Sequence, residues 1–97
     1  MRFDRQEKEA LKYALQDFSG KIFLFGSRLD DTKKGGDIDI MVIPEKKINA
    51  LKLSLEIQKR FFTICEQKLD IIVYNYDNPF CREVIKNGKR LDIQAID

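Results

Sequence analysis

Residues 21–43 decide the fold: KIFLFGSRLDDTKKGGDIDIMVI, two apolar segments separated by a polar one. Residues 21–25 form a short, nearly continuous apolar run, which is typical of a strand buried on both faces. In residues 37–43 the isoleucines and the valine at every second position point to one face and the two aspartates and the methionine to the other, which indicates a second strand. Gly26-Ser27 ends the first strand, and Gly35-Gly36 precedes the second. We therefore expect two strands joined by a short helix or turn and a loop.

The rest of the chain alternates helices and strands around this pair. Apolar residues at helical spacing and β-branched runs predict helices over residues 3–18, 47–67 and 78–87, a third strand over 69–74, and a tail at 91–96 that suits an edge strand. The order implies an α/β or α+β fold, a small mixed sheet flanked by helices. At 97 residues we expect one domain, residues 1–97.

Composition excludes several classes of function. The chain is 43% hydrophobic and 35% charged, and no apolar run is long enough to cross a membrane. The charged N-terminus lacks the features of a signal peptide, so we expect a cytoplasmic protein whose Cys65 and Cys81 are reduced. A net charge of +2 does not indicate nucleic-acid binding. The absence of histidine removes Ser-His and Cys-His centres and most catalytic zinc sites.

Three aspartates form the candidate catalytic and metal site. Asp37 and Asp39 are two residues apart on a predicted strand, which places both carboxylates on one face. Asp70 is the second residue of the third predicted strand, so the three converge if these strands are neighbours. Oxygen ligands without His or thiolate suit Mg²⁺ or Mn²⁺, and two such ions support in-line phosphoryl displacement. The third carboxylate would then take the proton of the attacking hydroxyl.

Gly26, Ser27 and Arg28 are the candidate phosphate-binding residues. A Gly-Ser turn between a strand and a helix start offers backbone N–H groups and a hydroxyl to phosphate oxygens, and Arg28 adds a charged fork.

These motifs together resemble the DNA polymerase β nucleotidyltransferase superfamily. The resemblance rests on Phe25-Gly26-Ser27-Arg28, nine residues from Arg28 to Gly36, Asp37-Ile38-Asp39-Ile40, and the strand that begins Leu69-Asp70. In size and element order the chain is most similar to the minimal nucleotidyltransferases (MNT proteins), which are little more than a catalytic palm. This resemblance implies that Asp37, Asp39 and Asp70 are metal ligands, that Asp70 is the general base, and that Gly26 and Ser27 hold the nucleotide's phosphates.

The resemblance also implies a reaction and a partner. MNT proteins pair with all-helical HEPN proteins in toxin-antitoxin systems, in which the MNT antitoxin transfers AMP from ATP to a tyrosine of the toxin. We therefore expect Mg²⁺-dependent transfer of a nucleoside monophosphate to a protein hydroxyl. The alternatives are a non-catalytic antitoxin that occludes a HEPN toxin, and transfer to a small molecule such as an aminoglycoside. A partner subunit or a homodimer would complete the small site.

Each motif also has a purely structural interpretation. Asp37 and Asp39 would then be a polar strand entry, and Asp70 the partner of a lysine such as Lys68. Arg28 would be a surface ion-pair residue, and Lys33-Lys34 a solvated part of the loop. Phe61 and Phe62 cannot both point inward, so one is available for an interface, while Tyr74 and Tyr76 suit either packing or stacking on a base.

Overall fold

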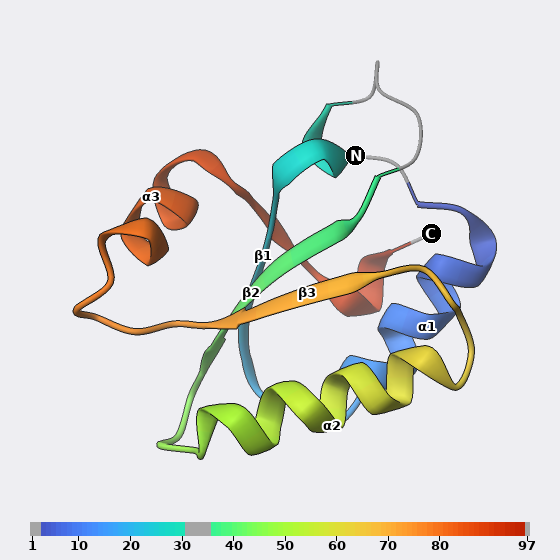
Figure 1. Cartoon of the computed structure of the whole chain (residues 1–97), viewed down its shortest axis with the longest axis horizontal. Coiled ribbons are helices and arrows are strands. Elements are labelled where there is room, and N and C mark those ends of the chain that lie inside the picture. The colour runs from blue at the N-terminus through green and yellow to red at the C-terminus, as the bar shows by residue number, and fades with distance from the viewer. Residues whose placement is uncertain (1–2, 31–35, 97) are drawn as a thin grey trace.

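The computed structural model describes residues 3–30 and 36–96, and Lys33-Lys34, considered above as a solvated part of the loop, lies outside them. Within these ranges the sheet has four strands in the order β3-β2-β1-β4. Their bounds are β1 Gly20–Phe25, β2 Ile38–Pro44, β3 Leu69–Val73 and β4 Lys89–Leu91. The strand β1 is antiparallel to β2 and β4, whereas β2 and β3 are parallel. The fold is the expected small mixed sheet flanked by helices (Figure 1).

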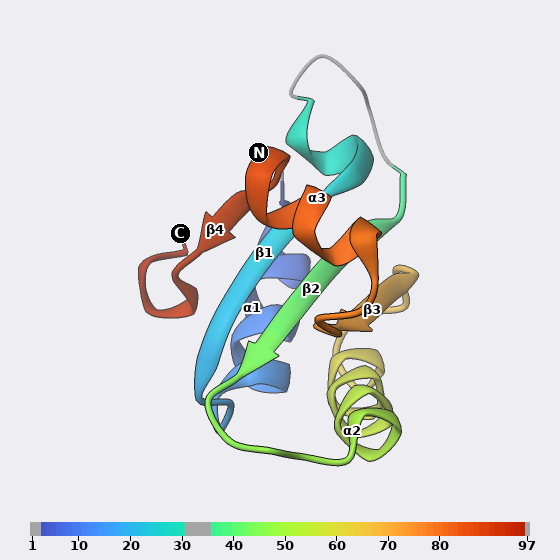
Figure 2. The same cartoon turned by 90° about the vertical axis from the view of Figure 1, so that its left-hand side faces the viewer.

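Helices cover both faces of the sheet. The helices are α1 Arg5–Leu15, α2 Ala50–Phe62 and α3 Pro79–Asn87, and short 3₁₀ turns are η1 Gly26–Leu29 and η2 Ile93–Ala95. Figure 2 shows α3 on one side of the sheet and α1 with α2 on the other. The strands β2 and β3 are parallel because α2 carries the chain back across the sheet between them.

The alternation along β2 sorts its side chains between two cores. Ile38, Ile40 and Val42 are fully buried in the larger core, with α1 and α2. Met41 faces the other way and packs with Phe23 against α3. This is the distribution expected from the sequence, and it puts Asp39, which alternates with Ile38 and Ile40, on the α3 side.

The helix ends follow local capping chemistry. Asp4 and Glu7 form a reciprocal capping box at the start of α1, and Asn49 caps α2 through the Lys52 amide. Pro79 stands in the first turn of α3. Helix α2 is therefore shorter than the expected 47–67, because it begins only after its cap and ends at Phe62.

The C-terminal tail corrects one expectation. The edge strand is Lys89–Leu91, which pairs with Ile22, Phe23 and Leu24 of β1, and the residues after it form η2 rather than a strand over 91–96. Asp92 accepts a hydrogen bond from the Gln94 amide and so caps this last turn.

Two further expectations concern cysteines and membrane spans. Cys65 and Cys81 are both buried free thiols, as expected. No helix in the described part of the chain has the length and apolar character needed to cross a bilayer.

Candidate active site

Asp39 lies where three strands meet. It is in register with Phe25 at the end of antiparallel β1 and with Asp70 near the start of parallel β3. A backbone hydrogen bond from the Ile38 amide to the Lys68 carbonyl, 3.1 Å long, fixes this end of the β2–β3 pair. The structure therefore brings Asp39 and Asp70 together as neighbours on one face, as the sequence predicted.

The two carboxylates influence each other electrostatically. Burial raises the pKa of the Asp39 carboxyl, and the negative charge of Asp70 together with a hydrogen bond to Asp70 raises that pKa further. The charge of Asp37 acts in the same direction, and Lys68 opposes it. Adjacent carboxylates of this kind disfavour each other's ionisation unless a cation lies between them. The pair is thus suited to holding either a proton or a metal ion.

Asp37 directly precedes β2 and forms an ion pair with Lys68. Its Oδ2 lies 3.6 Å from Lys68 Nζ, and the two side chains are 46% and 66% exposed. Such an exposed ion pair contributes little to stability. Lys68 therefore pairs with Asp37, whereas the sequence had suggested Asp70 as its partner. No three acidic or thiol side chains in residues 3–30 and 36–96 are gathered into a ready metal cage; Asp37 would have to leave Lys68 to join the other two.

The Gly-Ser turn lies directly against the carboxylates. Gly26 follows β1 with φ +78°, and a Cβ at this position would overlap Asp39 Oδ2. The left-handed backbone conformation favours glycine here, and the Asp39 carboxylate would have to turn aside to admit any side chain at this position. Ser27 lies beside the entry to β2, because a Cβ on Gly36 would be 2.6 Å from Ser27 Oγ. The Gly-Ser turn therefore contacts the carboxylate of Asp39 and Gly36, the residue before Asp37.

Arg28 is buried rather than displayed on the surface. Its guanidinium makes two hydrogen bonds to the Glu7 carboxylate, of 2.8 Å and 2.6 Å, and both side chains are 5% exposed. It also donates to the Gly36 carbonyl. The hydrogen bonds to Glu7 raise the pKa of Arg28, so it stays charged. The surface ion pair considered for Arg28 is wrong, and the guanidinium fork expected to bind phosphate is turned toward Glu7 and Gly36.

Two further residues that act on the same segment, Glu7 and Gln67, were not predicted from the sequence. Glu7 stands one turn before Leu11 on the apolar face of α1, and a carboxylate in such a stripe is a signal for a buried partner. Gln67 donates a 3.2 Å hydrogen bond to the Gly36 carbonyl, and nothing in its sequence context predicts this.

The aromatic residues considered in the sequence divide between packing and exposure. The Phe25 and Phe80 rings meet edge to face, with centroids 5.5 Å apart, next to Asp39 in the sheet register. Tyr74 packs in the smaller core, whereas Tyr76 is exposed. Of the neighbouring phenylalanines of α2, Phe61 is fully buried and Phe62 is exposed.

A small mixed sheet with paired carboxylates beside a Gly-Ser turn is the arrangement that the sequence resemblance led us to expect of a nucleotidyltransferase domain. The sequence matches the family described as Polymerase beta, Nucleotidyltransferase over residues 9–94, and the chain belongs to that family. The predicted superfamily resemblance is confirmed.

One solved structure with a similar fold carries a more particular description, the toxin-antitoxin MntA-HpeT mutant, with two aspartate-to-glutamate substitutions. The similarity has a TM-score of 0.64 and 18% sequence identity, and covers 86% of this chain and 70% of that chain. At this identity the likeness shows a shared fold, which confirms the predicted fold class. No curated protein matches the sequence significantly.

Proposed function

We propose that the chain is a divalent-metal-dependent nucleotidyltransferase that moves AMP from ATP to a hydroxyl of a protein partner, as the antitoxin of a HEPN-type toxin. The observation that carries this proposal is the in-register pair of Asp39 and Asp70, with Gly26 packed against Asp39. Family membership gives the reaction class, and the toxin-antitoxin description of the similar structure supports the partner class.

The residues present fit a hard divalent cation. Asp37, Asp39 and Asp70 supply only oxygen ligands, which suit Mg²⁺ or Mn²⁺ in a two-ion site. Burial, and then the neighbouring charges of Asp70 and Asp37, raise the pKa of Asp39, and a cation would relieve the repulsion between these carboxylates. When bound, the metal ions would offset the charge of the triphosphate and of the leaving pyrophosphate.

The protein's own groups have separate roles in the transfer. The hydroxyl of Ser27 and the backbone N–H groups of the Gly26-Ser27 turn bind phosphate oxygens. The acceptor oxygen bonds to the α-phosphorus, the bond from that phosphorus to the bridging oxygen breaks, and pyrophosphate leaves. Asp70 takes the hydroxyl proton. The side chain of Arg28 is absent from this phosphate-binding set, because it is engaged with Glu7 and Gly36.

A partner protein accounts for an apolar surface on α2. Leu51, Leu55 and Phe62 recur at helical spacing along this helix and are 68%, 55% and 46% exposed. Exposed apolar side chains grouped in this way favour contact with another protein. A second copy of the chain is the alternative occupant of this surface.

The direct test is transfer of label from α-³²P-ATP in the presence of Mg²⁺. The purified protein is incubated alone and with the all-helical protein expected from the adjacent reading frame. Asp39→Asn and Asp70→Asn are compared with Asp17→Asn, a matched change at an exposed carboxylate whose surface ion pair with Arg60 contributes little to stability. Label should appear on the partner with the wild type and Asp17→Asn, and fall at least about 100-fold with the other two. The same reaction with labelled GTP, CTP and UTP measures base preference.

The second candidate function is neutralisation by occlusion without catalysis, and the toxin-antitoxin description of the similar structure supports a toxin partner for this candidate as well. In that case Asp39→Asn and Asp70→Asn would bind the partner and relieve its toxicity as well as the wild type does, and no nucleotide would label the partner. Labelling of an aminoglycoside without any protein partner would instead support transfer to a small molecule.

A further inference from the structure

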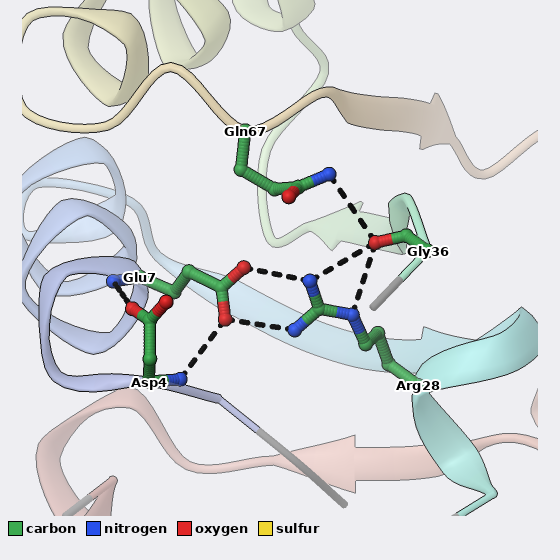
Figure 3. Close-up of polar contacts among 5 residues, drawn as sticks. All are labelled: Asp4, Glu7, Arg28, Gly36 and Gln67. Carbon is green, nitrogen blue, oxygen red and sulfur yellow. Dashed lines mark hydrogen bonds and ion pairs between the residues drawn. The ribbon is translucent and has the colours of Figure 1, made fainter. Parts of the chain in front are cut away.

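The carbonyl oxygen of Gly36 is a point at which three segments of the chain meet. It accepts hydrogen bonds from Arg28 Nε at 3.1 Å, Arg28 Nη2 at 2.9 Å and Gln67 Nε2 at 3.2 Å (Figure 3). Arg28 belongs to η1, Gln67 precedes β3, and Gly36 directly precedes Asp37. Two side chains therefore hold the peptide that leads into a candidate metal ligand.

Arg28 is itself oriented by Glu7 of α1. The Glu7 carboxylate accepts from both terminal nitrogens of the guanidinium and also from the Asp4 amide, at 2.9 Å. A planar guanidinium held on two sides has little freedom to rotate. A buried ion pair of this kind is weak evidence for added stability, because desolvation offsets its attraction. Its definite effect is geometric: it fixes where the remaining donors of Arg28 point.

The contact between Arg28 and the Gly36 carbonyl also sets the position of Ser27. Gly36 has φ +90°, and a Cβ added to it would be 2.6 Å from Ser27 Oγ. Arg28 follows Ser27 in the chain and binds the carbonyl of Gly36. The hydrogen bonds from Arg28 thus join the Gly-Ser turn to the residue before Asp37, and so set the spacing between the phosphate-binding and metal-binding motifs.

We propose that Arg28, oriented by Glu7, and Gln67 are positioning residues that hold the Gly36 carbonyl so that Ser27 and Asp37 face one metal-bound nucleotide. This inference rests on the proposed function for its metal and nucleotide, but the positioning of Gly36 and Asp37 can be measured without catalysis. It gives Arg28 a role other than the phosphate contact expected from the sequence. Misplacement of a reacting group by about 1 Å is enough to lower a rate about 100-fold.

Two variants separate positioning from folding. Arg28→Lys keeps the charge but loses the fork that reaches both Glu7 and Gly36. Gln67→Ala removes the third donor and changes a side chain whose hydrogen bond is solvent-exposed, so the variant should fold even if Arg28→Lys does not. Each has a matched control outside the site. Arg60→Lys alters an arginine paired with Asp17 and Glu56, and Gln94→Ala truncates an exposed glutamine of η2.

Three measurements are made on folded protein well below its melting temperature. Backbone ¹⁵N order parameters report the rigidity of Gly36 and Asp37 in the metal-free state. Titration with Mn²⁺, followed by electron paramagnetic resonance, reports metal affinity without turnover. Transfer kinetics from ATP to the partner separate kcat from KM. We expect both site variants to lower the Asp37 order parameter from about 0.85 toward 0.6, to weaken Mn²⁺ binding about 10- to 100-fold, and to lower kcat more than they raise KM.

The outcomes distinguish this inference from the proposed function. If Arg28→Lys and Gln67→Ala lower only the melting temperature, with Asp37 order and Mn²⁺ affinity as in the wild type, the residues are merely structural and the inference is overturned. If Arg28→Lys does not fold, Gln67→Ala alone decides in the same way. If the wild type neither binds Mn²⁺ nor transfers nucleotide, the proposed function fails, and an unchanged Asp37 order parameter in Gln67→Ala would then refute the positioning role as well.

Discussion

Replacing Gly26 by alanine tests whether the Gly-Ser turn and the carboxylates form one packed unit. Gly26 has φ +78°, and its new methyl group would overlap Asp39 Oδ2. The left-handed backbone costs an L-residue about 1–2 kcal/mol, and forcing a methyl group into an occupied space adds about 1–3 kcal/mol. We expect the free energy of unfolding to fall by about 2–5 kcal/mol, and each kcal/mol lowers the melting temperature by about 4–8 °C in a domain of this size.

The two contributions separate in a double-mutant cycle measured by urea unfolding. In an Asp39→Ala background the overlap is gone, so Gly26→Ala should cost only the backbone strain, about 1–2 kcal/mol. Gly20→Ala serves as the control, because its methyl group would meet the Ile43 carbonyl oxygen and should cost the same in both backgrounds. An equal cost of Gly26→Ala with and without the Asp39 carboxylate would refute the packing on which the site is built.

Three further predictions concern the acidic pair and the core. First, Asp39→Asn should stabilise the metal-free protein at pH 7 by on the order of 1 kcal/mol. Because folding raises the pKa of Asp39, the wild type loses stability as pH rises through that pKa. The advantage of Asp39→Asn should therefore vanish below the pKa of an aspartate in the unfolded chain, about 3.9. Urea unfolding at several pH values checks this, and an advantage that persists at pH 3 contradicts it. Second, Mg²⁺ at a hundred times its Kd should stabilise the wild type by about 2.7 kcal/mol and Asp39→Asn much less, as measured by thermal unfolding; an equal shift in both would remove Asp39 from the metal site. Third, Phe61→Ala should cost about 3–5 kcal/mol and Phe62→Ala about 1 kcal/mol or less, since Phe61 is fully buried and Phe62 is 46% exposed; similar costs in chemical denaturation would show that the face of α2 is wrongly assigned.

The sequence predicts those elements whose signal is carried by their own residues. The apolar run of β1 and the alternation of β2 are properties of the segments themselves, and both strands were located to within one residue. Strand β4 was misplaced because only Leu91 of its three residues is buried. It is a strand because β1 offers an unpaired edge, and an interaction between distant segments leaves no local periodicity.

The aspartates of the site were predictable from the sequence, whereas the burial of Arg28 was not. The spacing of Asp37 and Asp39 and the family resemblance predicted a carboxylate cluster, and the register places Asp70 opposite Asp39. The burial of Arg28 was not predictable, because its partner Glu7 lies 21 residues earlier and already has a local role in a capping box. The place of Glu7 on the apolar face of α1 indicates that it has a buried partner, but no local pattern says which residue that partner is.

The sheet order explains why the site must be organised around β2. Strand β2 is central to the site because β1 and β3 flank it, and only a residue on the middle strand contacts both the end of an antiparallel neighbour and the start of a parallel one. Asp39 occupies that position. A slip of β2 by one residue would turn Asp39 toward α1 and α2 and expose Ile38 and Ile40 on the other face. Because both isoleucines are fully buried, the hydrophobic core that stabilises the sheet also holds the acidic pair in register.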